Sequence, residues 1–200
     1  MIDEAKLVTA AQRGELPAFN QLVLHYQGLA YNVAYRVMGT QDGAADATQD
    51  AFLKAYKGLQ SFRGGNFKSW LLRIVTNTCY DHLRALKRRP TTDLDDLLVD
   101  PDHNWRVLDP AEGPAEHAER LELADLLQWA IAQLPPDQRA VVVLSDIQGL
   151  SYEEIAEVMD TSLGTVKSRL SRARAKLRHS LQTRQELLPL QYRLTDGLSS

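Results

Sequence analysis

The sequence has 200 residues, of which 44% are hydrophobic and 24% charged, with 11 Gly and 8 Pro. This balance is typical of a globular protein with one or two small domains, and it excludes a large multidomain enzyme and a disordered or collagen-like chain. No run approaches 18 apolar residues and no signal peptide is recognisable, so we expect a cytoplasmic protein without direct membrane insertion. Cys79 is the only cysteine, and with five scattered His the sequence predicts neither a disulfide nor a metal site.

The formal net charge of -3 combines segments of opposite sign. Residues 63–90 hold seven Lys or Arg against Asp81 alone, and residues 164–180 hold six Lys or Arg and no acid. Residues 91–125, between them, hold eleven Asp or Glu against two Arg. Two separated basic segments predict two contact surfaces for nucleic acid, and the acidic segment would reduce indiscriminate attraction to it.

Apolar residues recur every three or four positions over residues 15–38, which predicts a helix with one buried stripe. Further helices are predicted over about 45–59 and 68–87, each after a glycine-containing break. Periodicity disappears over residues 90–114, where we expect a linker. Helical spacing returns over 118–134 and, after two prolines, over 139–147. The sequence therefore predicts an all-α protein, with two small helical domains joined by a flexible acidic linker.

Residues 150–178 predict a helix-turn-helix. Ser151 and Glu154 have capping-box spacing at the start of a short helix, and about four residues separate it from a second helix with a buried apolar seam. The turn has no central glycine, so Asp160 or a neighbour must adopt the bend. The outer face of the second helix carries no carboxylate and is predicted to enter a major groove, where base or phosphate contacts would come from Thr165, Lys167, Ser168, Arg169, Ser171, Arg172, Arg174 and Lys176. The alternative is an ordinary solvated basic helix.

A second stripe follows the predicted helix over residues 68–87, and it consists of Trp70, Arg73, Asn77, Tyr80, Arg84 and Lys87. Aromatic rings interleaved with cations suit unpaired bases, because stacking one base is worth roughly 1–3 kcal/mol. Opening duplex DNA costs about 1.4 kcal/mol per step, so one or two captured bases cannot hold a bubble open alone. Trp70 can equally be a core residue. Over residues 46–57 a third set is displayed at helical spacing, which by itself is an ordinary solvated face: Asp46, Gln49, Asp50, Leu53, Lys54 and Lys57.

Together these motifs resemble the extracytoplasmic-function sigma factors, the smallest members of the sigma-70 family of transcription initiation factors. The resemblance spans nearly the whole chain, through DATQDAFLKAY (46–56), SFRGGNFKSW (61–70), IVTNTCYD (74–81) and LSYEEIAEVMDTSLGTVKSRLSRARAKLR (150–178). It implies that residues 1–90 form region 2 and residues 117–182 form region 4. Residues 91–116 would be the acidic linker, threading toward the polymerase channels, and residues 183–200 a tail without an assigned role.

The resemblance also implies a role for each set of residues. The displayed face of residues 46–57 would bind the largest subunits of core RNA polymerase. The minus-ten promoter element would be contacted by Phe62, Arg63, Asn66, Lys68, Trp70, Arg73, Asn77, Tyr80, Arg84, Lys87 and Arg88, with residues 62–68 shaping a pocket for a flipped base. The helix-turn-helix would read the minus-thirty-five element as duplex.

By the same resemblance the protein would be no enzyme and would need no cofactor, since it lends sequence recognition to the polymerase. An anti-sigma factor would regulate it, and could hold it at the membrane indirectly. Two alternatives from other classes are a dimeric helix-turn-helix repressor or activator, which would leave the motifs of residues 46–70 unexplained, and a nuclease. A nuclease would need carboxylates or histidines clustered at metal-ligand spacing, and the sequence offers only the pair Asp46 and Asp50.

Overall fold

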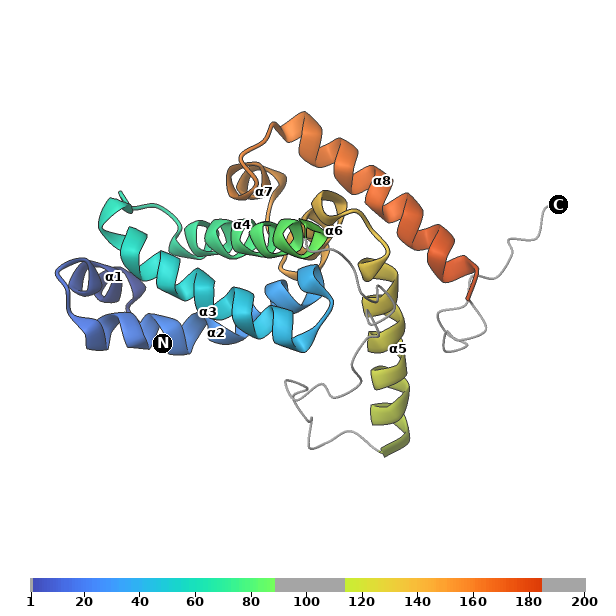
Figure 1. Cartoon of the computed structure of the whole chain (residues 1–200), viewed down its shortest axis with the longest axis horizontal. Helices are drawn as coiled ribbons and strands as arrows, with labels where there is room; N and C mark the ends of the chain where they lie inside the picture. The colour runs from blue at the N-terminus through green and yellow to red at the C-terminus, as the bar shows by residue number, and fades with distance from the viewer. Residues whose placement is uncertain (1, 89–113, 185–200) are drawn as a thin grey trace.

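The computed structural model describes residues 2–88 and 114–184, and its regular elements there are helical (Figure 1). The first stretch contains α1 (Glu4–Gln12), α2 (Leu16–Met38), α3 (Gln41–Gly58), the short 3₁₀ helix η1 (Leu59–Ser61) and α4 (Phe67–Arg88). The second contains α5 (Pro114–Ala132), α6 (Pro136–Val142), the π-helical turn η2 (Val143–Ile147), α7 (Tyr152–Val158) and α8 (Leu163–Gln182). The predicted all-α class is confirmed for these residues. Most of the expected acidic linker and the tail beyond residue 184 lie outside them.

The first domain is a bundle in which α2 lies against α1, α3 and α4. The helix predicted over residues 15–38 is present as α2, which ends at Gly39 with a left-handed φ of 87°. Helix α3 begins four residues earlier than predicted, because the Thr40 side chain accepts a hydrogen bond from the backbone N–H of Gly43 (3.3 Å) and caps the helix. Helix α1 is an addition to the elements that periodicity indicated.

Small side chains set the spacing inside this bundle. The buried side of α3 consists of alanines that are fully inaccessible: Ala44, Ala47, Ala51 and Ala55. Because an alanine face lets neighbouring backbones approach closely, α3 packs against both α2 and α4. The larger core side chains come from those two helices, among them Leu22, Tyr35, Phe67 and Leu71. The outer side of α3 is therefore free to carry polar residues.

The second domain contains the predicted helix-turn-helix. Ser151 accepts a hydrogen bond from the Glu154 N–H (3.2 Å) and Glu154 accepts one from the Ser151 N–H (2.9 Å), which confirms the capping box. Asp160 has a φ of 49° and is the only non-glycine residue with a positive φ in the described part of the chain. It takes the bend that the sequence assigned to it or a neighbour. Val166, Leu170 and Ala173 form the buried seam of α8.

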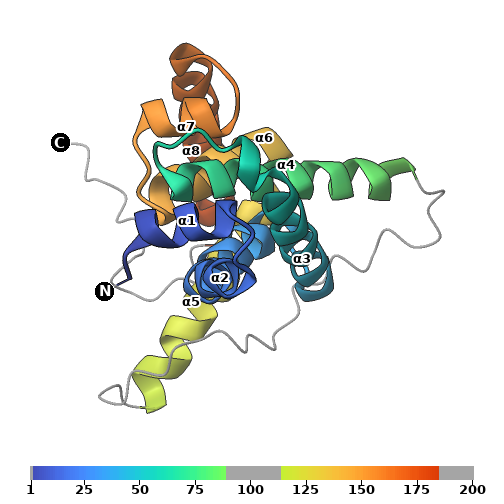
Figure 2. The same cartoon turned by 90° about the vertical axis from the view of Figure 1, so that its left-hand side faces the viewer.

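The two domains touch each other in this structure. Helix α7 lies beside α4 (Figure 2). Helix α2 contacts α5, α6 and η2. The Arg139 guanidinium on α6 donates hydrogen bonds to the carbonyl oxygens of Val37, Ala132 and Leu134, and so joins the last turns of α2 and α5. Across the described residues, no helix is both long and apolar enough to span a bilayer.

Candidate polymerase and nucleic-acid interfaces

We call Trp70, Arg73, Asn77, Tyr80, Arg84 and Lys87 the α4 stripe. The three cations and Asn77 are exposed, and the two aromatic residues are half-buried. The Trp70 ring packs on those of Phe62 (centroids 5.2 Å apart) and Phe67 (5.4 Å), so its indole belongs partly to an aromatic cluster at the edge of the core. Burial raises the pKa of the Tyr80 hydroxyl, with the Asp137 charge acting in the same direction. Tyr80 is therefore a neutral hydrogen-bond donor at physiological pH.

The loop that precedes α4 is held by a side chain of α1. The Gln12 side-chain amide on α1 donates to the carbonyl oxygens of Leu59 (3.1 Å) and Phe62 (2.7 Å), which holds the start of the loop. Gly64 and Gly65 follow with φ of 91° and 94°, values that other residues rarely adopt. Asn66 then caps α4, because its side-chain oxygen accepts from the Ser69 N–H (3.1 Å). A shaped, glycine-containing loop thus sits at the beginning of the α4 stripe.

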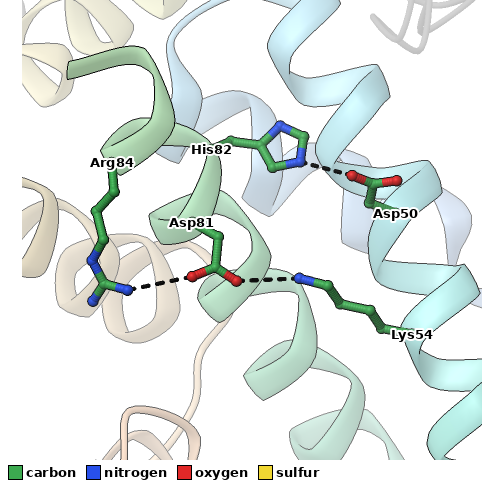
Figure 3. A network of polar contacts seen from close by, with 5 residues as sticks. All are labelled: Asp50, Lys54, Asp81, His82 and Arg84. Atoms are coloured by element: carbon green, nitrogen blue, oxygen red, sulfur yellow. Dashed lines mark hydrogen bonds and ion pairs between the residues drawn. The ribbon is translucent and has the colours of Figure 1, made fainter. Parts of the chain in front are cut away.

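The six residues displayed on α3 form a second surface, which we call the α3 face: Asp46, Gln49, Asp50, Leu53, Lys54 and Lys57. All are exposed, and Leu53 is unusual for an apolar side chain because it is 53% exposed. Two contacts tie this face to α4 (Figure 3): Asp50 to His82 at 2.9 Å and Lys54 to Asp81 at 3.2 Å. Asp81 also forms an ion pair with Arg84 of the α4 stripe at 3.3 Å. The α3 face and the α4 stripe therefore share one polar network.

The third surface is the α8 face, which we define as Thr165, Lys167, Ser168, Ser171, Arg172 and Lys176. Five of these residues are exposed and Thr165 is half-buried. A shallow groove of about 410 Å³ opens beside the face, lined by Lys167, Ser171, Arg174 and Arg178 together with Tyr152. Its basic lining and exposed position suit a phosphate backbone.

Two arginines predicted beside the α8 face are already paired within the domain. Arg169 meets Asp137 of α6 at 3.0 Å, and Arg174 meets Asp146 through two contacts of 2.6 and 3.0 Å. Partial burial raises the pKa of the Asp146 carboxyl, but hydrogen bonds from Arg174 and Ser145 and the Arg174 charge outweigh it, so this pKa is lowered overall. The pairing orients both guanidinium groups at the edge of the α8 face.

No group of three or more His, Cys, Asp or Glu side chains in residues 2–88 and 114–184 is placed to hold a metal ion. Asp46 and Asp50 lie on the exposed α3 face, without a third carboxylate in a metal-binding arrangement there.

Known proteins share both domains. The family model described as "Sigma-70 region 2" matches residues 22–89, and the one described as "Sigma-70, region 4" matches residues 124–177. The ECF RNA polymerase sigma-E factor of Haemophilus influenzae is 37% identical over 186 residues, which cover 91% of this chain and 96% of that protein. This chain belongs to the extracytoplasmic-function sigma factors of the sigma-70 family. The RNA polymerase sigma-H factor of Pseudomonas aeruginosa is 40% identical over 184 residues, covering 90% of this chain and 94% of that one.

Two solved structures are similar to this chain in fold. CnrH, solved in complex with the cytosolic domain of CnrY, has a TM-score of 0.62 at 31% identity, covering 88% of this chain and 96% of that chain. The sigma factor RpoE of Bartonella quintana, solved in complex with the anti-sigma factor NepR, has a TM-score of 0.64 at 28% identity, covering 82% and 96%.

As a sigma factor, the chain is a transcription initiation factor that directs RNA polymerase to promoters, and it is not an enzyme. The resemblance and the two-domain organisation inferred from the sequence are confirmed. The repressor and nuclease alternatives are set aside, because neither accounts for region 2 beside region 4.

Some residues that shape these surfaces carried no sequence signal. Gln12 holds the loop before α4, and His82 ties α4 to the α3 face. Arg139 links the domains through carbonyl oxygens, which any sequence supplies. Asp81 did carry a sequence signal, because it is the one acid within the basic segment of residues 63–90.

Proposed function

We propose that this sigma factor starts transcription with three separate surfaces. The α3 face binds the largest subunits of core RNA polymerase. The α4 stripe and residues 62–68 hold the minus-ten element as a single strand, with Arg88 contacting the backbone. The α8 face, flanked by Arg169 and Arg174, reads the minus-thirty-five element as duplex. The observation that carries this division is the placement of the surfaces: two share a polar network in one domain, while the third faces outward on the other.

The energetics favour a factor that acts only with the polymerase. Stacking a base returns roughly 1–3 kcal/mol, and the half-buried Trp70 and Tyr80 offer few rings for it. Separating several base-pair steps costs about 1.4 kcal/mol each, so the stripe alone cannot maintain an open bubble. Melting then needs the polymerase's own contacts, and the isolated protein binds its promoter weakly.

An anti-sigma factor is the proposed regulator of this chain. Support comes from the two similar structures, one solved with the cytosolic domain of CnrY and the other with the anti-sigma factor NepR. In this proposal the chain is cytoplasmic, and any attachment to a membrane is indirect, through that partner.

The division of labour is tested by transcription in vitro with sigma-free core polymerase and a library of promoter fragments. With core polymerase, the protein should start transcripts at defined sites. Without core polymerase, it should show little preference for promoter DNA. Asn77→Ala should reduce open-complex formation and leave binding to minus-thirty-five duplex intact. Arg172→Ala should weaken binding to minus-thirty-five duplex and leave open-complex formation intact. Arg13→Ala, at the exposed end of α1, is the matched control. Specific melting by the protein alone would refute the proposal.

A further inference from the structure

One side chain of α1 reaches the backbone just before α4. Gln12 is the last residue of α1, and its Nε2 lies 3.1 Å from the carbonyl oxygen of Leu59 and 2.7 Å from that of Phe62. A primary amide has two N–H groups, so it can donate to both oxygens at once. Leu59 begins η1 and Phe62 is the first residue after it. Gln12 therefore holds the chain at the point where it enters the loop of residues 62–68.

This loop needs to be held because it contains two adjacent glycines. Gly64 and Gly65 both have a left-handed φ, and without side chains they can adopt many other conformations at little cost. At the far end of the loop, Asn66 caps α4 through the Ser69 N–H at 3.1 Å. Only three residues, 63–65, lie between Phe62 and Asn66. With both ends fixed, few conformations remain for the loop between them.

Helix α1 is itself fixed to the core beneath the loop. Its inner side buries Val8 and Ala11, and the Tyr26 hydroxyl of α2 donates a hydrogen bond to the Glu4 carboxylate. The Tyr26 ring packs on that of Phe67, the first residue of α4, with centroids 5.5 Å apart. The Gln12 amide is therefore placed by a packed helix, and that helix is attached to the same aromatic cluster as the beginning of α4.

The chemistry of Gln12 suits a supporting role better than a DNA contact. Both hydrogen bonds of its nitrogen go to the backbone around the loop, so it acts on DNA through the loop. The amide is uncharged, whereas the cations that can meet phosphate, Arg63 and Lys68, belong to the loop and to α4. Hydrogen bonds to a base weaken steeply when donor and acceptor shift or tilt. A pocket that tells bases apart must therefore keep its backbone in one conformation.

We propose that Gln12 is a positioning residue for minus-ten recognition, which fixes residues 62–68 in the conformation that discriminates between flipped bases. This inference rests on the proposed minus-ten role of the loop. It assigns a specificity-determining residue to α1, outside the three surfaces defined above. Substituting Gln12 should alter base preference and strand opening, and should leave binding to core polymerase and to minus-thirty-five duplex unchanged.

The test uses the full chain with core polymerase on fork-junction templates derived from a promoter found in the transcription experiment above. The templates carry each of the four bases in turn at every minus-ten position. Gln12→Met keeps the length of the side chain and removes both donors, whereas Gln12→Lys keeps N–H donors on a long side chain. Gln21→Met, the same exchange at an exposed position of α2, is the matched control.

The measured quantity is the ratio of open-complex formation on the preferred base to that on the other bases. In Gln12→Met this ratio should fall by about 3- to 10-fold, which corresponds to the net contribution of one or two hydrogen bonds. Gln12→Lys should recover part of it, and the control should match the natural chain. Gln12→Asn, one methylene shorter, should show the same loss and replaces the methionine variant if that one is unstable in urea unfolding.

An equal loss on all four bases, with an unchanged ratio, would mean that Gln12 only stabilises the fold and would overturn the inference. Arg63→Ala, an exposed residue of the loop itself, separates the inference from the function on which it rests. If Arg63→Ala changes base preference and Gln12→Met does not, the loop keeps its minus-ten role and Gln12 loses its own. If neither variant changes base preference, the minus-ten role of the loop is wrong, and the inference falls with it.

Discussion

The thiol of Cys79 is the most protected reactive group in the described part of the chain. It is fully buried, and burial raises its pKa from 9.0 to about 12. We expect no alkylation by a maleimide at pH 7.5 until the first domain opens, and rapid alkylation in denaturant. Fast labelling of the native protein would contradict this packing.

The same burial predicts an alkaline loss of stability. Because the folded-state pKa lies above the unfolded value, the folded protein keeps the proton that the unfolded chain releases. The contribution of Cys79 is therefore complete below about pH 9 and falls as the pH rises from 9 toward 12. Urea unfolding at a series of pH values measures it. Cys79→Ala should show a smaller alkaline decline than the natural chain.

The capping box gives a second prediction at this scale. Ser151→Ala removes the acceptor for the Glu154 N–H and should lower the free energy of unfolding by about 1 kcal/mol. Ser180→Ala, in the last turn of α8, is the control and should change it little. Equal effects of the two substitutions in urea unfolding would show that the cap contributes nothing. This cap and the bend at Asp160 were predictable from sequence, because each depends on a few adjacent residues.

Among the helices, predictions from sequence succeeded where the apolar period is long. Helices α2 and α4 have 23 and 22 residues, and their buried faces repeat several times. Helix α1 has only nine residues and buries Val8 and Ala11, too few repeats to distinguish from chance. The α3 face was also recognisable as polar and exposed, but its ties to α4 depend on how two helices pack, which periodicity does not determine.

The α3 face predicts a separation between stability and partner binding. Lys54→Ala removes an exposed ion pair with Asp81 and should change the free energy of unfolding by less than about 1 kcal/mol. If Lys54 lies in the polymerase interface, the same substitution should weaken core binding by about fivefold or more. Lys6→Ala on α1, also an exposed paired lysine, is the control. Native affinity for core polymerase in Lys54→Ala would remove this residue from the interface.

Two arginines of α8 should behave differently. Arg172 is exposed, so Arg172→Ala should reduce the slope of log affinity against log salt by about 0.9 per lost phosphate contact and leave stability unchanged. Arg174 pairs with Asp146, and Arg174→Ala should also lower the free energy of unfolding of the second domain, by about 1 kcal/mol or less because both groups are partly exposed. Duplex titrations at several salt concentrations, together with urea unfolding, distinguish the two roles. If Arg172→Ala lowered the free energy of unfolding and Arg174→Ala did not, the ion pair between Arg174 and Asp146 would be contradicted.

At the scale of the whole molecule, the contact between domains was beyond sequence analysis. The pairs that form it are far apart in the chain, as Arg73 is from Asp160, and the acids of α7 look in sequence like an ordinary solvated face. Charge layout indicated two basic surfaces, yet it could not say that a cation of one of them would pair with an acid of the other domain. That pairing arises only when α7 packs on α4.

Arg139 should help to hold the two domains in contact. Its guanidinium lies at the C-terminal ends of α2 and α5, where helix dipoles and the carbonyl oxygens of Val37, Ala132 and Leu134 favour a cation. Burial lowers its pKa, but from a value so high that the group stays charged. Arg139→Met leaves those oxygens without their donor and should cost about 2–4 kcal/mol in urea unfolding. Arg139→Lys, which keeps the charge but fewer donors, should cost less.

The exposed Arg172→Met is the control for loss of a cation. Because Arg139 belongs to none of the three proposed surfaces, transcription by Arg139→Lys at a temperature where it stays folded should start at the same sites as the natural chain. With spin labels at Asn20→Cys and His179→Cys, one exposed position in each domain, the distance distribution between the domains should nevertheless broaden in Arg139→Lys. Of the three hydrogen bonds that Arg139 donates, the one to Val37 crosses between the domains. A variant with unaltered stability and an unaltered distance would show that the two domains are held by other contacts.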